Sequence, residues 1–202
     1  MKENIWFTAD LHFGHEDILG YCRRPFANIA EHDEALIKNW NDCVADRDRI
    51  YILGDFAFRN HNDYLLRLKG RKYFIIGSHD TMNAETKKHF ITVSEMKTVR
   101  YRGRFFELCH YPLRSWERCW EGSVMLHGHS HNRITANNLS FDVGVDANDY
   151  KPFSIVEIME KVKEREKTMR KNHRIVKEAD GKTRYYQDDV KWLEFLLKKI
   201  EK

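Results

Sequence analysis

The stretch SVMLHGHSH (residues 123–131) joins a short apolar run to three histidines, His127, His129 and His131, which alternate with other residues. Its first half is typical of a buried β-strand, because it is short, apolar and rich in β-prone side chains. The abrupt change to polar residues then places the histidines where the strand ends. They could be packed core residues, surface residues or metal ligands, and the rest of the chain has to decide.

Four other stretches have the same form, an apolar run that ends in polar residues. They are NIWFTAD (4–10), RIYILGD (49–55), RKYFIIGSHD (71–80) and RFFELCHYP (104–112). Two further strands are predicted in SEMKTVRY (94–101), which forms a hairpin with 104–112, and in LSFDVGVD (139–146). Helical periodicity lies between the early strands, at EHDEALIKNWNDCV (31–44) and NHNDYLLRLKG (60–70). Alternation of strand and helix implies parallel pairing, with helices covering the sheet faces, and therefore an α/β fold.

The length of 202 residues fits one domain with an appendage. We assign residues 1–151 to the core and residues 152–202 to a C-terminal extension packed on it. The extension is predicted to contain a helix that has Pro152 in its first turn, a hairpin at 173–186 that turns at Asp180-Gly181, and a final helix at 188–202. We expect it to shape substrate access or an oligomer contact.

Charge and cysteine content indicate the cellular setting. Residues 1–156 hold 21 Lys/Arg and 21 Asp/Glu, whereas residues 157–202 hold 14 and 10, so the net charge of +4 lies in the extension. That excess could favour a polyanionic partner, but it is also typical of a solvated helix surface. The sequence lacks an apolar run of about 18 residues, a secretory signal and a CxxC pair, which predicts a cytoplasmic protein with free thiols and no membrane contact.

Chemically active side chains follow the predicted strands in a regular way. A lone aspartate after a strand is usually a turn former or a helix cap, and a lone histidine is usually a packed residue. Here the placement recurs in five segments, and ligands of α/β proteins bind beyond the carboxyl ends of strands. His32, His61, His89 and His173 have no such placement and are predicted to be ordinary residues. The residues at the strand ends are Asp10, His12, Asp55, Ser78, His79, Asp80, His110, His129 and His131.

The order of these blocks resembles that of the calcineurin-like metallophosphoesterases. The chain has D-L-H at 10–12, G-D at 54–55, G-S-H-D at 77–80, a lone histidine at 110 and G-H-S-H at 128–131. The family has D-x-H, G-D, G-N-H-D/E, H and G-H-x-H, and the match spans residues 4–146. Five blocks in order are far more specific than any single short motif. The resemblance implies a two-layered β-sheet core flanked by helices.

The resemblance also implies a pair of divalent metal ions. Asp10, His12, Asp55 and His131 would hold one ion, and Asp55 would bridge to a second ion held by residues 78, 110 and 129. Gly128 would let the backbone turn tightly, whereas His127 matches no family position and is assigned a structural or supporting role. Ligands that are all nitrogen or oxygen suit Mn²⁺, which we favour, or Fe, Ni²⁺ or Zn²⁺.

The same resemblance gives His79 and Asp80 catalytic roles. His79 would contact the phosphate and protonate the leaving oxygen, and Asp80 would orient its imidazole. A positioned acid of this kind contributes a factor of about 10²–10⁴. Further candidate substrate contacts are His15, Arg23, Arg24 and Arg59, although each arginine could equally be a surface charge.

One position departs from the family pattern, because Ser78 stands where the family has asparagine. A serine hydroxyl is a shorter and weaker metal ligand than an amide oxygen. The sequence therefore predicts a metal-dependent phosphoesterase that acts on a phosphodiester, a phosphorylated small molecule, a nucleotide or a nucleic acid through a hydroxide activated by the two ions. The alternative is a catalytically weakened relative that binds a phosphorylated or nucleic-acid ligand.

Overall fold

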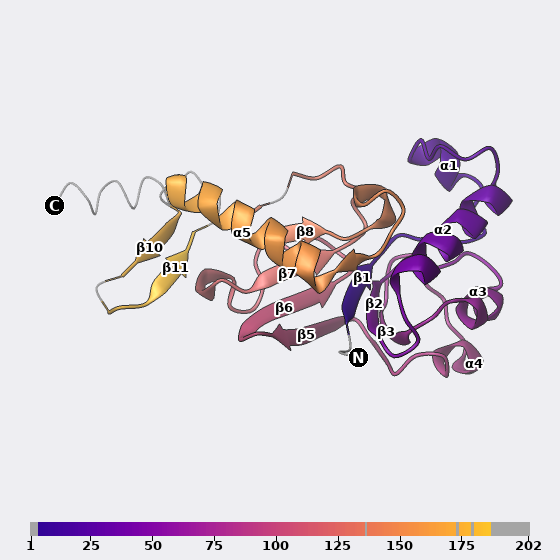
Figure 1. The fold of residues 1–202 in the computed structure, drawn as a ribbon, viewed down its shortest axis with the longest axis horizontal. Helices are drawn as coiled ribbons and strands as arrows, with labels where there is room; N and C mark the ends of the chain where they lie inside the picture. The colour runs from indigo at the N-terminus through magenta and orange to yellow at the C-terminus, as the bar shows by residue number, and fades with distance from the viewer. Residues whose placement is uncertain (1–3, 136, 173, 179, 187–202) are drawn as a thin grey trace.

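Two β-sheets packed face to face form the centre of the protein, and helices lie on the outer side of the first sheet (Figure 1). The computed structural model describes residues 4–135, 137–172, 174–178 and 180–186. The first sheet has the order β4-β3-β2-β1-β9, the second has the order β5-β6-β7-β8, and β10 and β11 pair separately. The predicted α/β fold with a two-layered sheet core is thus confirmed.

The described strands and helices follow the predicted order closely. The strands are β1 (Ile5–Thr8), β2 (Arg49–Leu53), β3 (Arg71–Ile75), β4 (Thr92–Ser94), β5 (Met96–Tyr101), β6 (Arg104–Cys109), β7 (Val124–His127), β8 (Ser140–Asp142), β9 (Phe153–Ser154), β10 (Ile175–Lys177) and β11 (Thr183–Tyr185). The helices are α1 (Ile18–Tyr21), α2 (Ile29–Cys43), α3 (His61–Arg67), α4 (Ala84–Lys87) and α5 (Ile155–Lys171), with 3₁₀ helices at Cys119–Glu121 and Val145–Ala147.

Strand pairing explains why apolar runs, rather than alternating patterns, mark the first sheet. Strands β1 to β4 pair in parallel, and the sheet is covered on both faces, so both sets of side chains are buried. Along β2, Tyr51 and Leu53 face the second sheet, while Ile50 and Ile52 pack with α2 on the other face. In the second sheet β5 and β6 form the predicted antiparallel hairpin, and β6, β7 and β8 pair in parallel.

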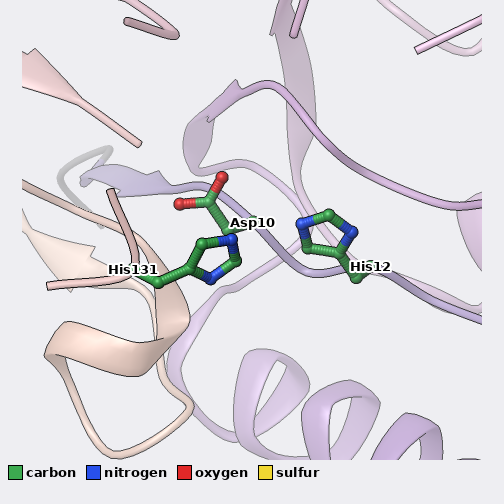
Figure 2. Close-up of side chains that lie close together, drawn as sticks. All are labelled: Asp10, His12 and His131. Carbon is green, nitrogen blue, oxygen red and sulfur yellow. The ribbon is translucent and has the colours of Figure 1, made fainter. Parts of the chain in front are cut away.

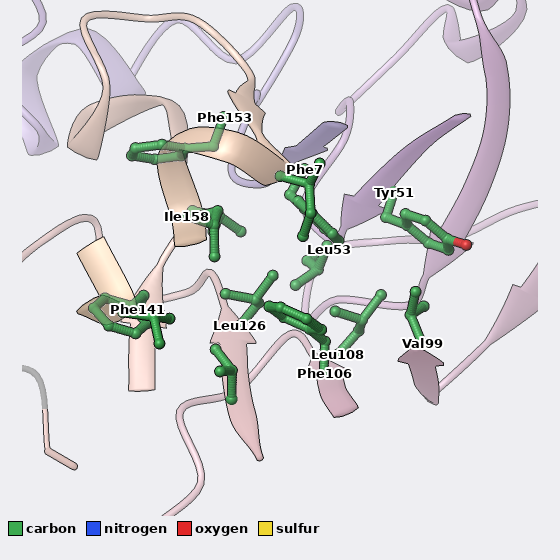
Figure 3. Packing of buried hydrophobic residues seen from close by; sticks show 14 of the residues in the cluster. Phe7, Tyr51, Leu53, Val99, Phe106, Leu108, Leu126, Phe141, Phe153 and Ile158 are labelled. Carbon is green, nitrogen blue, oxygen red and sulfur yellow. The ribbon is translucent and has the colours of Figure 1, made fainter. Parts of the chain in front are cut away.

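The core between the sheets is continuous with the start of the C-terminal segment. Phe7 of the first sheet and Phe106 of the second are stacked with their ring centroids 6.5 Å apart (Figure 3). Ile158 and Val162 of α5 belong to the same buried cluster. Helix α5 begins with a capping box. The Ser154 side chain accepts from the backbone N–H of Glu157, and the Glu157 side chain accepts from the backbone N–H of Ser154.

Two details near the end of the core and the start of the C-terminal extension differ from the sequence prediction. Pro152 does not lie in the first turn of a helix, because Phe153 and Ser154 first pair with β1 as the antiparallel edge strand β9. The predicted strand at 139–146 is shorter and ends at Asp142. The hairpin at 173–186 is present as β10 and β11. The final helix predicted at 188–202 lies outside the described residues, so the division at 151/152 stays a prediction. Among the described helices, none combines the length and apolar composition needed to span a bilayer.

The packing of α5 on the core can be tested with two substitutions in the same helix. Ile158 of α5 is fully buried in the core, whereas Val156 of the same helix is 57% exposed. We expect Ile158→Ala to lower the free energy of unfolding by about 2–5 kcal/mol, because it leaves a cavity in the core. Val156→Ala should change it by less than about 0.5 kcal/mol. Urea denaturation would measure both, and equal effects would contradict this packing.

Candidate metal centre

The loops that follow β1, β2, β3, β6 and β7 meet at one edge of the two sheets and bring the predicted ligands together. Six of the seven fall into two groups, and within each group the potential ligand atoms lie within 4.8 Å of one another. We call Asp10, His12 and His131 the Asp10 group, and Asp55, His110 and His129 the Asp55 group. The seventh predicted ligand, Ser78, is beside the second group.

The Asp10 group is buried and lacks protein partners for two of its polar atoms. Figure 2 shows Asp10 and His12 from the loop after β1 facing His131 from the loop after β7. Asp10 is 0% exposed and His12 2%. Asp10 Oδ2 and His12 Nε2 have no hydrogen-bond partner among the described residues. A buried carboxylate oxygen and a buried imidazole lone pair without partners fit a bound cation, which would satisfy both.

The Asp55 group has one histidine whose orientation is fixed by the main chain. His110 Nδ1 donates to the Leu53 carbonyl at 2.8 Å, which leaves the Nε2 lone pair 3.5 Å from Asp55 Oδ2. A backbone carbonyl that holds one ring nitrogen in this way is the usual support of a metal-binding histidine. Ser78 Oγ lies 3.2 Å from Asp55 Oδ2 and 3.5 Å from His110 Nε2, so the hydroxyl faces the same group.

Asp55 lies between the two groups. Its Oδ2 atom is 3.6 Å from His12 Nε2 and 3.5 Å from His110 Nε2. Its Oδ1 atom accepts from the backbone N–H of His79 at 2.9 Å. One carboxylate therefore faces both sets of histidines, which is the arrangement that a bridging ligand requires.

Burial shifts the pKa values of the Asp10 group strongly. Burial raises the pKa of Asp10 well above its ordinary value, against the effect of His131. Burial, with the nearby positive charge of Arg24, lowers the pKa of His12 to about 2, so this imidazole is neutral and able to coordinate. Burial also disfavours the charged form of His131, but the hydrogen bonds with Asp146 and Cys22, together with the negative charge of Asp10, outweigh this and raise the pKa of His131 to about 10.

The ligand loops have an unusual backbone. Left-handed φ angles are rare for residues other than glycine and cost about 1–3 kcal/mol each. Such strained residues persist only where the surrounding structure enforces them, and they concentrate at functional sites. Five of the seven predicted ligands have them: Asp10 (55°), His12 (52°), Asp55 (52°), His129 (66°) and His131 (46°).

Gly128 has a different role from the predicted one. It has no left-handed φ angle, so a tight turn is not the reason for glycine here. A Cβ atom at this position would lie 2.5 Å from Ala9 Cβ and 2.8 Å from Asp10 Oδ2. The glycine is needed because the loop after β7 passes directly against the loop after β1.

Asp80 also makes contacts that differ from the expectation. Its carboxylate accepts from the backbone N–H groups of Asp55 (2.8 Å), Phe56 (3.0 Å) and Gly77 (2.7 Å). It has no hydrogen bond with the His79 imidazole within the described part of the chain. Asp80 thus joins the loop after β3 to the loop after β2 and fixes the backbone at Asp55.

Arg24, predicted as a substrate contact or a surface charge, is neither. It is buried, and its guanidinium donates to both carboxylate oxygens of Asp146 (2.9 and 2.7 Å) and to the carbonyls of Asp10 (2.7 Å) and Leu11 (3.1 Å). A fifth bond, 2.8 Å long, goes to Nε2 of His32. All five N–H groups are therefore used within the protein, and none remains for a substrate.

Asp146 is a functional candidate that the motif comparison missed. Its Oδ2 atom accepts from His131 Nδ1 at 2.7 Å and from Arg24 at 2.7 Å. The hydrogen bonds with His131 and Arg24 lower the pKa of Asp146 to about 2 despite its burial. The carboxylate turns the other nitrogen of His131 toward the Asp10 group. The only sequence signal was that Asp146 is the last residue of the predicted strand LSFDVGVD (139–146).

Of the remaining candidates, His15 joins the site. Its Nδ1 atom lies 3.3 Å from His12 Nδ1. Arg23 and Arg59 are exposed, with Arg59 beside Gly14, so their predicted substrate contacts stay predictions. His127 is buried and donates from Nδ1 to the Gly128 carbonyl at 2.9 Å, in keeping with a structural role. His32, His61 and His89, which were predicted to be ordinary residues, belong to neither ligand group. His173 lies outside the described residues.

Comparison with known proteins agrees with this geometry. The family model of the calcineurin-like phosphoesterases matches residues 3–199. An uncharacterized protein of Methanocaldococcus jannaschii is 34% identical over 174 residues, covering 79% of this chain and 93% of the relative. The gene 66 protein of Mycobacterium phage L5 is 28% identical over 181 residues, covering 71% of this chain and 87% of the relative.

Among solved structures, a protein of unknown function from Aquifex aeolicus superposes with a TM-score of 0.65 at 25% identity. The alignment covers 79% of this chain and all of the other. The family match shows that the chain is a metal-dependent hydrolase of phosphate esters. It belongs to the calcineurin-like phosphoesterase family.

The role of Asp146 can be tested by removing its charge. We expect Asp146→Asn to weaken binding of a divalent cation at the Asp10 group by about 10- to 100-fold, which is the usual effect of losing a group that orients a ligand. Isothermal titration with Mn²⁺ would measure this, with circular dichroism to verify folding. Asp42→Asn, in an exposed ion pair with Lys38, is the matched control and should bind normally. A folded Asp146→Asn protein of unchanged affinity would contradict the role.

Proposed function

We propose that this protein is a phosphodiesterase that holds two divalent cations, one in each ligand group, with Asp55 between them. The partnerless Asp10 Oδ2 and His12 Nε2 atoms carry this proposal, because a cation is the partner that suits a carboxylate oxygen and an imidazole nitrogen together. The donor set of nitrogen and oxygen atoms favours Mn²⁺, with Fe, Ni²⁺ or Zn²⁺ as alternatives. A cytoplasmic location remains part of the proposal.

The two cations, when bound, would neutralise the phosphate oxygens and lower the pKa of a water molecule. His79 is exposed at the mouth of the site, with its ring centroid 5.8 Å from that of His12. We assign it the proton that the leaving oxygen receives. Its backbone N–H is bonded to Asp55 Oδ1, so the position of this acid is tied to that of the central carboxylate. Asp80 supports both by holding the two loops together.

Ser78 favours a second candidate function, a relative that binds a phosphate or nucleic-acid ligand with little turnover. The hydroxyl donates to the Asp55 carboxylate at 3.2 Å instead of offering an amide oxygen to a cation. We rank hydrolysis first, because both ligand groups are otherwise complete.

Hydrolysis of a phosphodiester and a phosphomonoester with added Mn²⁺ would test the main proposal. We expect turnover that EDTA abolishes, and a lower kcat/KM in Asp55→Asn by at least about 100-fold, since loss of a shared ligand should exceed the loss of a supporting residue. The diester should be the better substrate. Equal turnover by the wild-type protein and Asp55→Asn would exclude the assigned site.

Ser78→Asn should strengthen the weaker metal site. An amide oxygen reaches further than the hydroxyl and is a better ligand, so we expect a higher Mn²⁺ stoichiometry or about a tenfold faster rate. Ser78→Ala, which adds no ligand, is the control and should show no gain. Metal content by mass spectrometry, together with kcat, would measure the change. If neither quantity rises, Ser78 does not limit the site.

A further inference from the structure

The exposed aromatic side chains in the described part of the protein gather at the candidate metal centre. Among the described residues, three aromatic side chains are largely exposed: Tyr21 (66%), Phe58 (43%) and Tyr111 (44%). Each of them contacts a histidine of the site: Tyr21 lies against His15, Phe58 against His15, His12 and His79, and Tyr111 against His110 and His129. Scattered exposed apolar residues need no explanation, but a set confined to one site is informative.

Phe58 and Tyr111 lie beside different ligand groups. The Phe58 ring centroid is 5.9 Å from that of His12 and 5.3 Å from that of His79, so it flanks the Asp10 group and the proposed acid. Tyr111 meets His110 and His129 edge-on, with centroids 4.9 and 4.8 Å apart, and flanks the Asp55 group. A phosphate held between the groups would thus have one aromatic ring near each side.

The Phe58 ring is also held in a defined orientation. It stacks on His15 with ring centroids 3.7 Å apart and an angle of 15° between the ring planes. An aromatic ring supported on one face and partly open to solvent offers a ready platform for another flat ring. Tyr111 directly follows His110, so its position depends on the same main chain that places this ligand.

We infer that the substrate is a single-stranded nucleic acid, whose bases on either side of the scissile phosphodiester stack on Phe58 and Tyr111. This inference rests on the proposed phosphodiesterase function. The phosphorus of a diester carries two ester groups, and one aromatic ring lies beside each of the two ligand groups. Unpaired bases are free to stack on protein rings, and such stacking accepts every base because each has a π-face. Bases in a duplex are already stacked on each other, so a duplex is the poorer ligand.

The test compares two single strands that differ only in their bases. One is a labelled oligonucleotide, as DNA and as RNA, and the other has the same backbone with abasic positions around the central phosphate. Binding is measured by fluorescence anisotropy in EDTA, where turnover stops, and kcat/KM is measured with Mn²⁺. We expect tighter binding and faster turnover of the strand that carries bases, and weaker binding of the same strand as a duplex.

Phe58→Ala and Tyr111→Ala should each reduce the preference for the base-bearing strand over the abasic strand by about 5- to 150-fold. Phe58→Trp, which keeps a flat ring, should retain it. Ile91→Ala, at an exposed apolar position outside the site, is the control and should keep the wild-type preference.

Equal binding of base-bearing and abasic strands, or equal losses on both in the alanine variants, would overturn the inference even if the protein hydrolyses phosphodiesters. Tighter binding of the base-bearing strand than of the abasic strand in EDTA, without any turnover in Mn²⁺, would separate the two proposals. It would refute the proposed hydrolysis and support the nucleic-acid ligand.

Discussion

The organisation of this protein depends on a buried carboxylate and a buried imidazole that each have one polar atom without a hydrogen-bond partner among the described residues. Burying an unpaired polar atom costs several kcal/mol, and burying a charge costs more. Asp10 and His12 are nevertheless buried, with Oδ2 and Nε2 unsatisfied by the described residues. Such an arrangement is stable only when a cation binds, or when proton transfer removes the charge. The buried Arg24 adds support by donating to the carbonyl of Asp10 and to Asp146, which in turn orients His131.

The main chain at the site is strained for the same reason. Ligands from separate strands converge on one point only if each loop turns sharply as it leaves the sheet, which accounts for the left-handed φ angles of five ligands. Glycines then allow the loops to touch. A Cβ atom at Gly77 would lie 2.5 Å from Asp55 Oδ1, and one at Gly144 would lie 2.6 Å from Asp10 Oδ2. These two glycines are therefore part of the site's geometry, since they let the backbone approach the carboxylates. The buried core between the two sheets stabilises the strand ends that hold these loops.

The sequence predicted most of this arrangement because apolar runs mark buried strands and parallel strands place their carboxyl ends together. That reasoning found the α/β class, the β5–β6 hairpin and the polar residues at the strand ends, whereas the two layers and the ligand assignment came from the family resemblance. It could not find which carboxylates support the ligands, because Asp146 contacts His131 and Arg24 only in three dimensions. It took Arg24 for a substrate contact or a surface charge for the same reason. The two-residue strand β9 was missed because it is too short to carry a periodic pattern.

The distribution of charge bears on how a polyanion could be recognised. In the described part of the C-terminal segment, the basic residues of α5 alternate with acidic ones along the helix. A cavity of about 680 Å³ separates α5 from the loop after His131, and Lys161 and Arg165 line it together with the acidic Asp142 and Glu164. The charged groups of Lys161 and Arg165 also lie over aromatic rings, 5.1 and 6.0 Å from the respective ring centroids. Strong phosphate contacts would make binding depend steeply on salt. A core with equal numbers of acidic and basic residues instead suits the recognition by stacking that we infer.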